Sequence, residues 1–205
     1  MSGKIYLYPM WVRLWHGLNA LLILFLIITG ISMQYSSPEQ PFIRFDLAVS
    51  IHNFCGMLLT ANYLVFIIGN IITPNGKYYR ITLKGMIDRL IKQFIYYTIG
   101  IFKHEKPPFP VTKESKFNPL QQFTYVVAMY FLVPIVFVTG WALLYPEIVL
   151  TKFFGGSGLK INDFVHVIIG FFVSFFMIIH IYFCTIGATF VSNFKSMISG
   201  FHESH

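Results

Sequence analysis

The sequence predicts an all-α membrane protein built as a bundle of four transmembrane helices. Of its 205 residues, 56% are hydrophobic and only 11% are charged. Four apolar runs are each long enough to cross a hydrocarbon layer about 30 Å thick. No low-complexity tract or evident internal repeat divides the chain, so a single domain over residues 1–205 is expected.

The predicted spans are Leu14–Met33, Leu47–Ile72, Phe123–Pro146 and Asn162–Phe190. The basic start of the chain could belong to a signal peptide. However, the first span contains His16 and lacks a small-x-small cleavage site, so it is interpreted as a mature helix.

Basic residues are distributed unevenly over the two sides of the predicted bundle. The polar connection of about residues 73–122 and the two termini hold twelve of the 15 Lys and Arg, against three on the opposite side. The positive-inside rule therefore predicts that this loop and both termini are cytoplasmic, in a bacterial or archaeal cytoplasmic membrane. The net charge of +7 is then explained by basic residues that orient the protein in the membrane, and no nucleic-acid partner is expected.

One stretch of the long loop has the pattern of an amphipathic helix. Apolar side chains recur at helical spacing over residues 83–95, while Lys84, Asp88, Arg89 and Lys92 occupy the other face. This pattern predicts a helix lying in the plane of the membrane interface. A surface helix packed on protein is the alternative.

Four histidines lie inside the predicted spans: His16, His52, His166 and His180. An imidazole in hydrocarbon is costly unless it binds something, so each marks a candidate functional site. His166 and His180 are separated by about four turns, which places them about 21 Å apart along similar sides of one helix. With the predicted orientation, His16 pairs with His180 near the cytoplasmic side and His52 pairs with His166 near the outer side.

Each predicted pair suits a haem. Two neutral imidazoles from facing helices can fill both axial positions of an iron, whereas structural zinc normally takes four protein ligands. Two b haems with bis-histidine ligation are therefore predicted, because the chain has no Cys-x-x-Cys-His motif for covalent attachment. A mixed site of His52 with Cys55 is a weaker alternative. Gly17, Gly56 and Gly170 near these histidines either make room for a macrocycle or allow close helix packing.

These residues resemble the prokaryotic dihaem cytochrome b family, the membrane subunits of thiosulfate reductases, respiratory formate dehydrogenases and nickel-iron hydrogenases. The resemblance covers nearly the whole chain and is greatest to the thiosulfate-reductase-type branch. It is carried by Pro9 to His16, Thr29-Gly30, His52-Asn53, Lys116 to Gln121, Thr139-Gly140 and the His166/His180 spacing.

The resemblance implies electron transfer across the membrane. An iron–sulfur subunit and a catalytic subunit of molybdenum or nickel-iron type would dock on the outer face, and menaquinone or ubiquinone would react near the inner haem. The family's quinone residue matches Asn118, with Gln121 a weaker candidate. A helix cap is the alternative for Asn118, because Asn followed by Pro is a common helix start.

Arg13 lies one turn before His16 and could pair with a haem propionate, although a basic membrane anchor is the more ordinary role. The predicted function is that of an electron-transferring cytochrome b subunit, which would not act alone on a soluble substrate. The alternative is a membrane anchor that conducts no electrons. A transporter would require inverted repeats or broken spans, and neither is evident.

Overall fold

The computed structural model describes residues 4–37, 39–149, 151–153, 156–187 and 189–203. Four helical segments within them are long and apolar enough to span a membrane: Met10–Tyr35, Phe45–Ile72, Pro119–Leu144 and Gly158–Cys184. Leucine, isoleucine and phenylalanine side chains remain exposed along all four, as expected of surfaces that face lipid. The prediction of an all-α membrane protein with four spans is confirmed.

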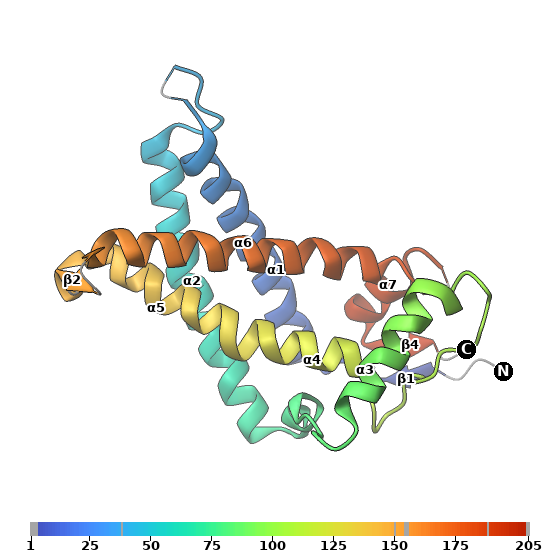
Figure 1. Cartoon of the computed structure of the whole chain (residues 1–205). Coiled ribbons are helices and arrows are strands. Elements are labelled where there is room, and N and C mark those ends of the chain that lie inside the picture. Colours follow the sequence, from blue (N-terminus) through green and yellow to red (C-terminus); the bar gives the residue numbers. More distant parts are fainter. Residues whose placement is uncertain (1–3, 38, 150, 154–155, 188, 204–205) are drawn as a thin grey trace.

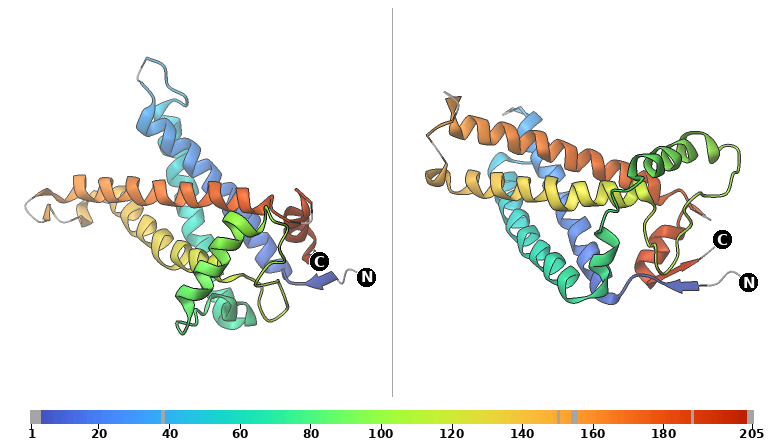
Figure 2. Two further views of the ribbon diagram at one scale, coloured as in Figure 1. Left: turned by 45° about the vertical axis from the view of Figure 1, so that its right-hand side comes forward. Right: turned by 60° about the horizontal axis from the view of Figure 1, so that its bottom comes forward.

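The spans form two antiparallel helix pairs that cross each other steeply (Figures 1 and 2). Helix α1 (Met10–Tyr35) packs along α2 (Phe45–Ile72), and α5 (Val133–Leu144) packs along α6 (Gly158–Cys184). Leu22, Cys55 and Leu59 form a buried apolar cluster between α1 and α2, and Phe137 of α5 packs against it. This cluster joins the two pairs where they cross.

The third span is one helix with a widened turn in the middle. It begins as α4 (Pro119–Val127), passes through the π-helical segment η3 (Ala128–Leu132) and continues as α5. Pro134 has no N–H to donate back along the helix, and a π-turn just before it accommodates that interruption. The Tyr63 hydroxyl donates to the carbonyl of Met129 at 2.9 Å, which provides a side-chain donor for a carbonyl of this turn.

The helix ends differ from the predicted ones, most clearly in the last span. That span was predicted to continue to Phe190, but α6 ends at Cys184. The side-chain amide of Asn193 donates to the carbonyls of Cys184 and Ile186 at 3.2 and 3.0 Å, which satisfies groups that a helix end leaves unpaired. The third span begins at Pro119 rather than Phe123 and ends at Leu144, because Tyr145 precedes a proline and leaves the helix.

The long loop contains a short 3-10 helix, η1 (Pro74–Tyr79), then helix α3 (Met86–Ile95) and a π-turn, η2 (Tyr96–Gly100). Ile87, Ile91 and Phe94 are exposed on α3, whereas Gln93 is buried. The apolar face is therefore turned away from the protein, which favours the predicted interfacial helix over a helix packed on protein by that face.

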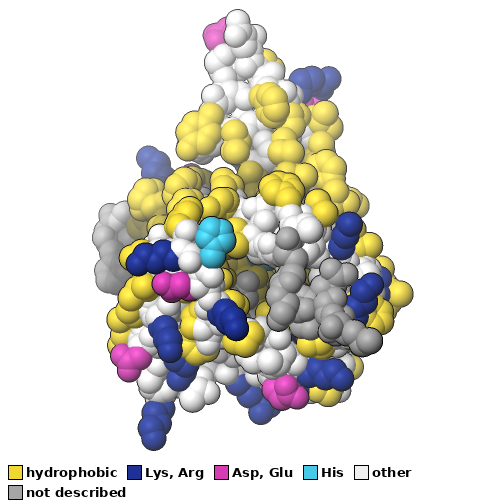
Figure 3. Space-filling view, turned by 90° about the vertical axis from the view of Figure 1, so that its right-hand side faces the viewer, with side chains coloured by type: hydrophobic (Ala, Val, Ile, Leu, Met, Phe, Trp, Pro, Cys, Tyr) yellow, Lys and Arg dark blue, Asp and Glu magenta, His cyan; other side chains and the backbone are white. Residues whose placement is uncertain are grey.

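The two ends of the chain lie together, a feature that was not predicted. Strand β1 (Lys4–Tyr6) pairs antiparallel with β4 (Phe201–Glu203), and helix α7 (Ser192–Ser199) precedes β4. A second small sheet pairs β2 (Lys152–Phe153) with β3 (Gly156–Ser157), after the 3-10 turn η4 (Pro146–Ile148). Figure 3 views the end that carries both termini and shows Lys and Arg side chains spread over it.

Candidate functional site

The structure brings the four histidines together in the two pairs that were predicted. The ring centres of His16 and His180 are 6.1 Å apart, and those of His52 and His166 are 6.3 Å apart. The first pair joins the start of α1 to the end of α6, next to the termini. The second joins the start of α2 to the start of α6, so α6 supplies one histidine to each pair.

The spacing of each pair fits a shared metal. A metal–imidazole nitrogen bond is about 2 Å long and the ring centre lies roughly 1 Å beyond the nitrogen, so two imidazoles across one iron have centres about 6 Å apart. Among the described residues, no group of three or more His, Cys, Asp or Glu converges as a metal site. Each pair thus offers two nitrogens, the number of axial ligands a haem iron needs.

Space beside the histidines is also compatible with a macrocycle. A Cβ atom built on Gly17, Gly56 or Gly170 would have no neighbour within 4 Å, other than adjoining backbone. Within the described ranges, these glycines therefore do not mediate close helix contacts. Cys55, in contrast, is buried in the apolar cluster with Leu22 and Leu59, which does not favour the mixed His52/Cys55 site.

Three of the four rings are held by a hydroxyl group. The Nδ1 atom of His52 lies 2.9 Å from Thr29 Oγ1, and that of His166 lies 2.9 Å from Thr139 Oγ1. The Nδ1 atom of His180 lies 3.3 Å from the Tyr125 hydroxyl. Partners at Nδ1 are common for histidines that bind metal through Nε2, because they fix the ring's orientation and tautomer.

These hydroxyl partners were missed in the sequence, although a signal was present. Thr-Gly occurs once in the first span and once in the third, each time in the helix that precedes a histidine-bearing helix. The separation from threonine to histidine is 23 residues in one case and 27 in the other. Because the two separations differ, the sequence alone does not reveal that each threonine is matched to a histidine on the next helix.

Asn118 is confirmed as a helix cap. Its Oδ1 accepts from the backbone N–H of Gln121 at 2.9 Å, while Gln121 Oε1 accepts from the backbone N–H of Asn118 at 3.2 Å. Asn118 Nδ2 also donates to the Tyr97 hydroxyl at 2.7 Å. The second amide hydrogen of Asn118 has no acceptor in the part of the chain that the structure describes, so the cap does not exclude a role in quinone binding.

A buried cation lies in the loop before α4. Lys116 is 3% exposed, and its Nζ donates to Asn75 Oδ1 at 3.2 Å. The ammonium group also sits 4.4 Å from the centre of the Tyr8 ring, close enough for a cation–π interaction. Burial lowers the pKa of Lys116 to about 8 and raises that of Tyr8 to about 12.

Arg13 lies at the start of α1 and contacts the C-terminal segment. Its Nη2 donates to the carbonyl of Ile198 in α7. Its Nε is buried and has no partner among the described residues. The structure thus shows Arg13 connecting α1 to α7.

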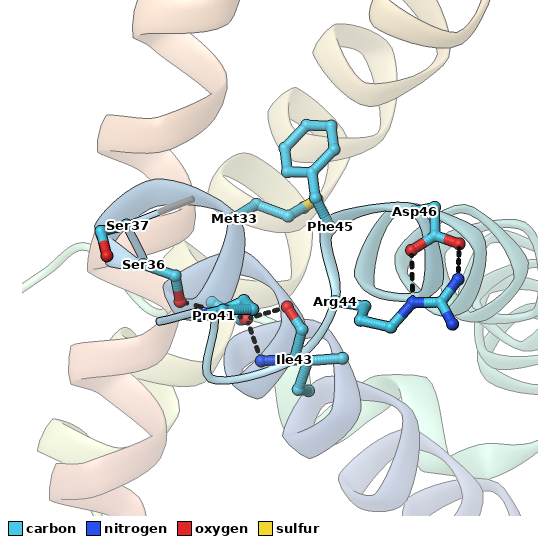
Figure 4. A pocket seen from close by; sticks show the side chains of 9 residues that line it. Met33, Ser36, Ser37, Pro41, Ile43, Arg44, Phe45 and Asp46 are labelled. Carbon is cyan, nitrogen blue, oxygen red and sulfur yellow. Dashed lines mark hydrogen bonds and ion pairs between the residues drawn. The ribbon is translucent and has the colours of Figure 1, made fainter. Parts of the chain in front are cut away.

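Two cavities lie outside the histidine pairs. One of about 460 Å³ lies at the turn between α1 and α2, where the Arg44–Asp46 ion pair is exposed (Figure 4). Another of about 260 Å³ is lined by Lys116, Pro119 and Gln122, among others. The paired histidines line neither, and Asn118 and Gln121 do not line the second.

Paired imidazoles within a four-span helical protein are the arrangement of a membrane-bound b-type cytochrome. The chain belongs to the prokaryotic cytochrome b561 family, whose sequence profile matches residues 7–200. It is 41% identical over 200 residues to YdhU, a protein of Escherichia coli (strain K12) named as a cytochrome. The match covers 98% of this chain and 75% of that protein. The chain is therefore a multi-pass b-type cytochrome of the inner membrane, with haem b as its cofactor and electron transfer as its function.

Proposed function

We propose that this cytochrome holds two b haems, one between His16 and His180 and one between His52 and His166. The observation that carries the proposal is the distance between the ring centres within each pair, 6.1 Å for the first and 6.3 Å for the second. Helix α6 contributes one histidine to each pair. Each haem would supply an iron that accepts and releases one electron. The protein side chains provide the ligands, the ring orientation and an apolar environment that excludes water.

The two sites would form a path for electrons through the membrane. His166 and His180 lie fourteen residues apart on α6, a rise of about 21 Å. The electron would have a shorter gap to cross than this rise, because each histidine pair would hold a haem. Phe176 stacks on His180 with ring centres 6.0 Å apart, so aromatic side chains fill part of the intervening space. An electron entering at one side could therefore leave at the other.

The partners proposed at the two ends are those implied by the family resemblance. An iron–sulfur subunit with a molybdenum or nickel-iron catalytic subunit would exchange electrons with the His52/His166 site on the outer face. Menaquinone or ubiquinone would react near the His16/His180 site. Asn118 is the proposed hydrogen-bond donor to a quinone carbonyl, because only one of its two amide hydrogens has an acceptor among the described residues; Gln121 is the weaker candidate.

Pyridine haemochrome spectra of the purified chain, with haem counted per polypeptide, test the proposal. Two b haems per chain are expected in the wild type and one in the His166→Asn variant. His104→Asn is the matched control, because His104 is exposed outside the spans and has a positive φ that asparagine tolerates. A folded wild-type protein without haem would contradict the proposal and favour a membrane anchor that conducts no electrons.

Quinone turnover of the assembled complex distinguishes the same alternatives. The electron path requires that His166→Asn abolish reduction or oxidation of quinone while activity with artificial dyes at the catalytic subunit is retained. An anchor would keep quinone turnover in this variant. The His104→Asn complex should behave as the wild type in both assays.

A further inference from the structure

Thr29 and Thr139 make the same set of contacts in the two helix pairs. Each hydroxyl lies 2.7 Å from the carbonyl four residues earlier in its own helix, that of Phe25 or Ile135. Each also lies 2.9 Å from Nδ1 of a histidine on the neighbouring helix. The threonines are 1% and 7% exposed, so water does not compete for these contacts.

This geometry determines which group donates. A threonine hydroxyl has one hydrogen, and the short contact to a helix carbonyl requires it, because a carbonyl can only accept. The oxygen then has lone pairs left for the imidazole, so the ring nitrogen Nδ1 must donate.

We propose that Thr29 and Thr139 are positioning residues for the outer haem. Resting on the proposed function, they hold His52 and His166 in the Nδ1–H tautomer, which leaves the Nε2 lone pair free for iron. A hydrogen bond from Nδ1–H to an oxygen also makes an imidazole a more basic ligand. More basic ligands favour the oxidised iron, so the two threonines keep the reduction potential of the outer haem low.

Among the described residues, both histidines of the outer pair have this threonine contact and neither histidine of the inner pair does. At the inner pair, the His180 ring has the longer contact to Tyr125, and no hydrogen bond to the His16 ring occurs among the described residues. The threonines therefore distinguish the outer haem from the inner one. Removing their hydroxyls should bring the two potentials closer if the outer haem has the lower one.

The test is a redox titration of the purified full chain, with the haem content measured in parallel. Thr29→Val and Thr139→Val, singly and together, replace a hydroxyl by a methyl of similar size. The double variant is expected to shift the outer haem's one-electron reduction equilibrium about tenfold toward the reduced form, a rise of about 59 mV. The inner haem should not shift, and the His52→Asn spectrum identifies which signal belongs to which haem.

Conservative and matched variants separate a ligand effect from a packing effect. Thr29→Ser with Thr139→Ser retains both hydroxyls and should restore the wild-type potential. Thr124→Val removes a hydroxyl whose hydrogen-bond partners among the described residues are the Leu120 and Gln121 carbonyls, so it should leave both potentials unchanged. If the double valine variant lost its haem, the two single variants would be titrated instead. Each is expected to raise the outer haem's reduction potential by less than the roughly 59 mV expected of the double variant.

An outer-haem potential that is unchanged in haem-replete valine variants would overturn this inference. So would a shift that the serine variants fail to reverse, or one of equal size in Thr124→Val. These results are distinct from failure of the proposed function, which would appear as an absence of haem in the wild-type protein. A melting temperature lowered without any change of potential would mean that the threonines only join the helices.

Discussion

The histidine pairs that the predicted orientation assigns to the outer and the inner side have nearly the same spacing but different surroundings. The outer pair, His52 and His166, lies between two threonines that make equivalent contacts from α1 and α5. The inner pair, His16 and His180, has one tyrosine hydroxyl at 3.3 Å and the Cys184 sulfur 3.8 Å from Nε2 of His180. The two pairs are thus alike in the distance between their rings, and they differ in the side chains that contact those rings.

The inner pair also lies near the part of the chain that is polar and irregular. Lys116 and Asn75 are buried there, and the partly buried Tyr8 ring contacts the Lys116 ammonium group. They come from the loop before α4, from η1 and from the N-terminal segment. The outer pair is framed instead by helix side chains. A site that exchanges protons with a quinone needs polar groups leading to water, whereas a site that passes electrons alone does not.

The largest effect is expected from removing one ligand in each pair. His180→Asn should abolish the inner haem and quinone turnover, yet leave an outer haem that the partner subunits can still reduce. His52→Asn should leave the inner haem in place while disconnecting it from those partners. Optical spectra taken after adding either the soluble substrate or quinol would check this. Loss of both haems in both variants would show that the sites are not independent.

A smaller effect than the loss of a ligand is expected from adding a methyl group beside each histidine of the outer pair, and the two histidines should respond differently. A Cβ on Gly140 would lie 3.1 Å from Cε1 of His166, whereas one on Gly30 would lie 3.6 Å from Cε1 of His52, an ordinary contact. Gly140→Ala should therefore displace the ring and cost about 1–2 kcal/mol. Gly30→Ala should be neutral or gain up to about 1 kcal/mol from helix propensity.

Thermal unfolding in detergent and haem retention measure that difference. Gly170→Ala is a useful third variant, since a Cβ there would have no neighbour within 4 Å among the described residues, adjoining backbone excepted. If it lost haem while the polypeptide remained folded, the porphyrin would lie against this glycine. Equal behaviour of the Gly140 and Gly30 variants would mean that the histidine rings adjust freely.

The spans and the histidine pairing could be predicted because each depends on one strong physical requirement. Hydrocarbon demands long apolar helices, and a buried imidazole demands a partner at its own depth. His16 with His180 and His52 with His166 follow from span direction alone. The positive-inside argument for cytoplasmic termini stays a prediction, although the two termini do lie together.

The contacts that refine the site could not be predicted in the same way. A threonine in a helix usually bonds to its own backbone, so nothing local shows that Thr29 and Thr139 also meet a histidine on another helix. The burial of Lys116 and the pairing of β1 with β4 depend on how segments far apart in sequence come together. Asn118 was predicted both as a cap and as a quinone residue, and the structure confirms the cap.

The buried cation near the inner pair predicts a pH dependence of stability. The pKa of Lys116 is about 8 when folded, below the value of about 10.4 expected when unfolded. The unfolded chain therefore binds the Lys116 proton more tightly between these values, so the contribution of Lys116 to stability should rise as pH increases from about 8 to 10.5. The raised pKa of Tyr8 acts in the opposite direction above about pH 10, so the rise is measured as the difference between the wild type and Lys116→Met. The full effect would be on the order of 3 kcal/mol. Lys116→Met should remove this rise, and a difference that falls over the range would contradict it.

The smallest effect is expected from the hydroxyl at the inner pair. Tyr125→Phe removes a contact of 3.3 Å to His180 Nδ1, longer than the 2.9 Å contacts of the threonines, and hydrogen bonds weaken with length. The inner haem's potential should therefore shift less than the outer one does in either single threonine variant. Redox titration of the three variants side by side checks the order. If Tyr125→Phe gave the larger shift, the hydrogen bond to His180 would be stronger than those to His52 and His166. The proposed contrast between the two pairs would then be reversed.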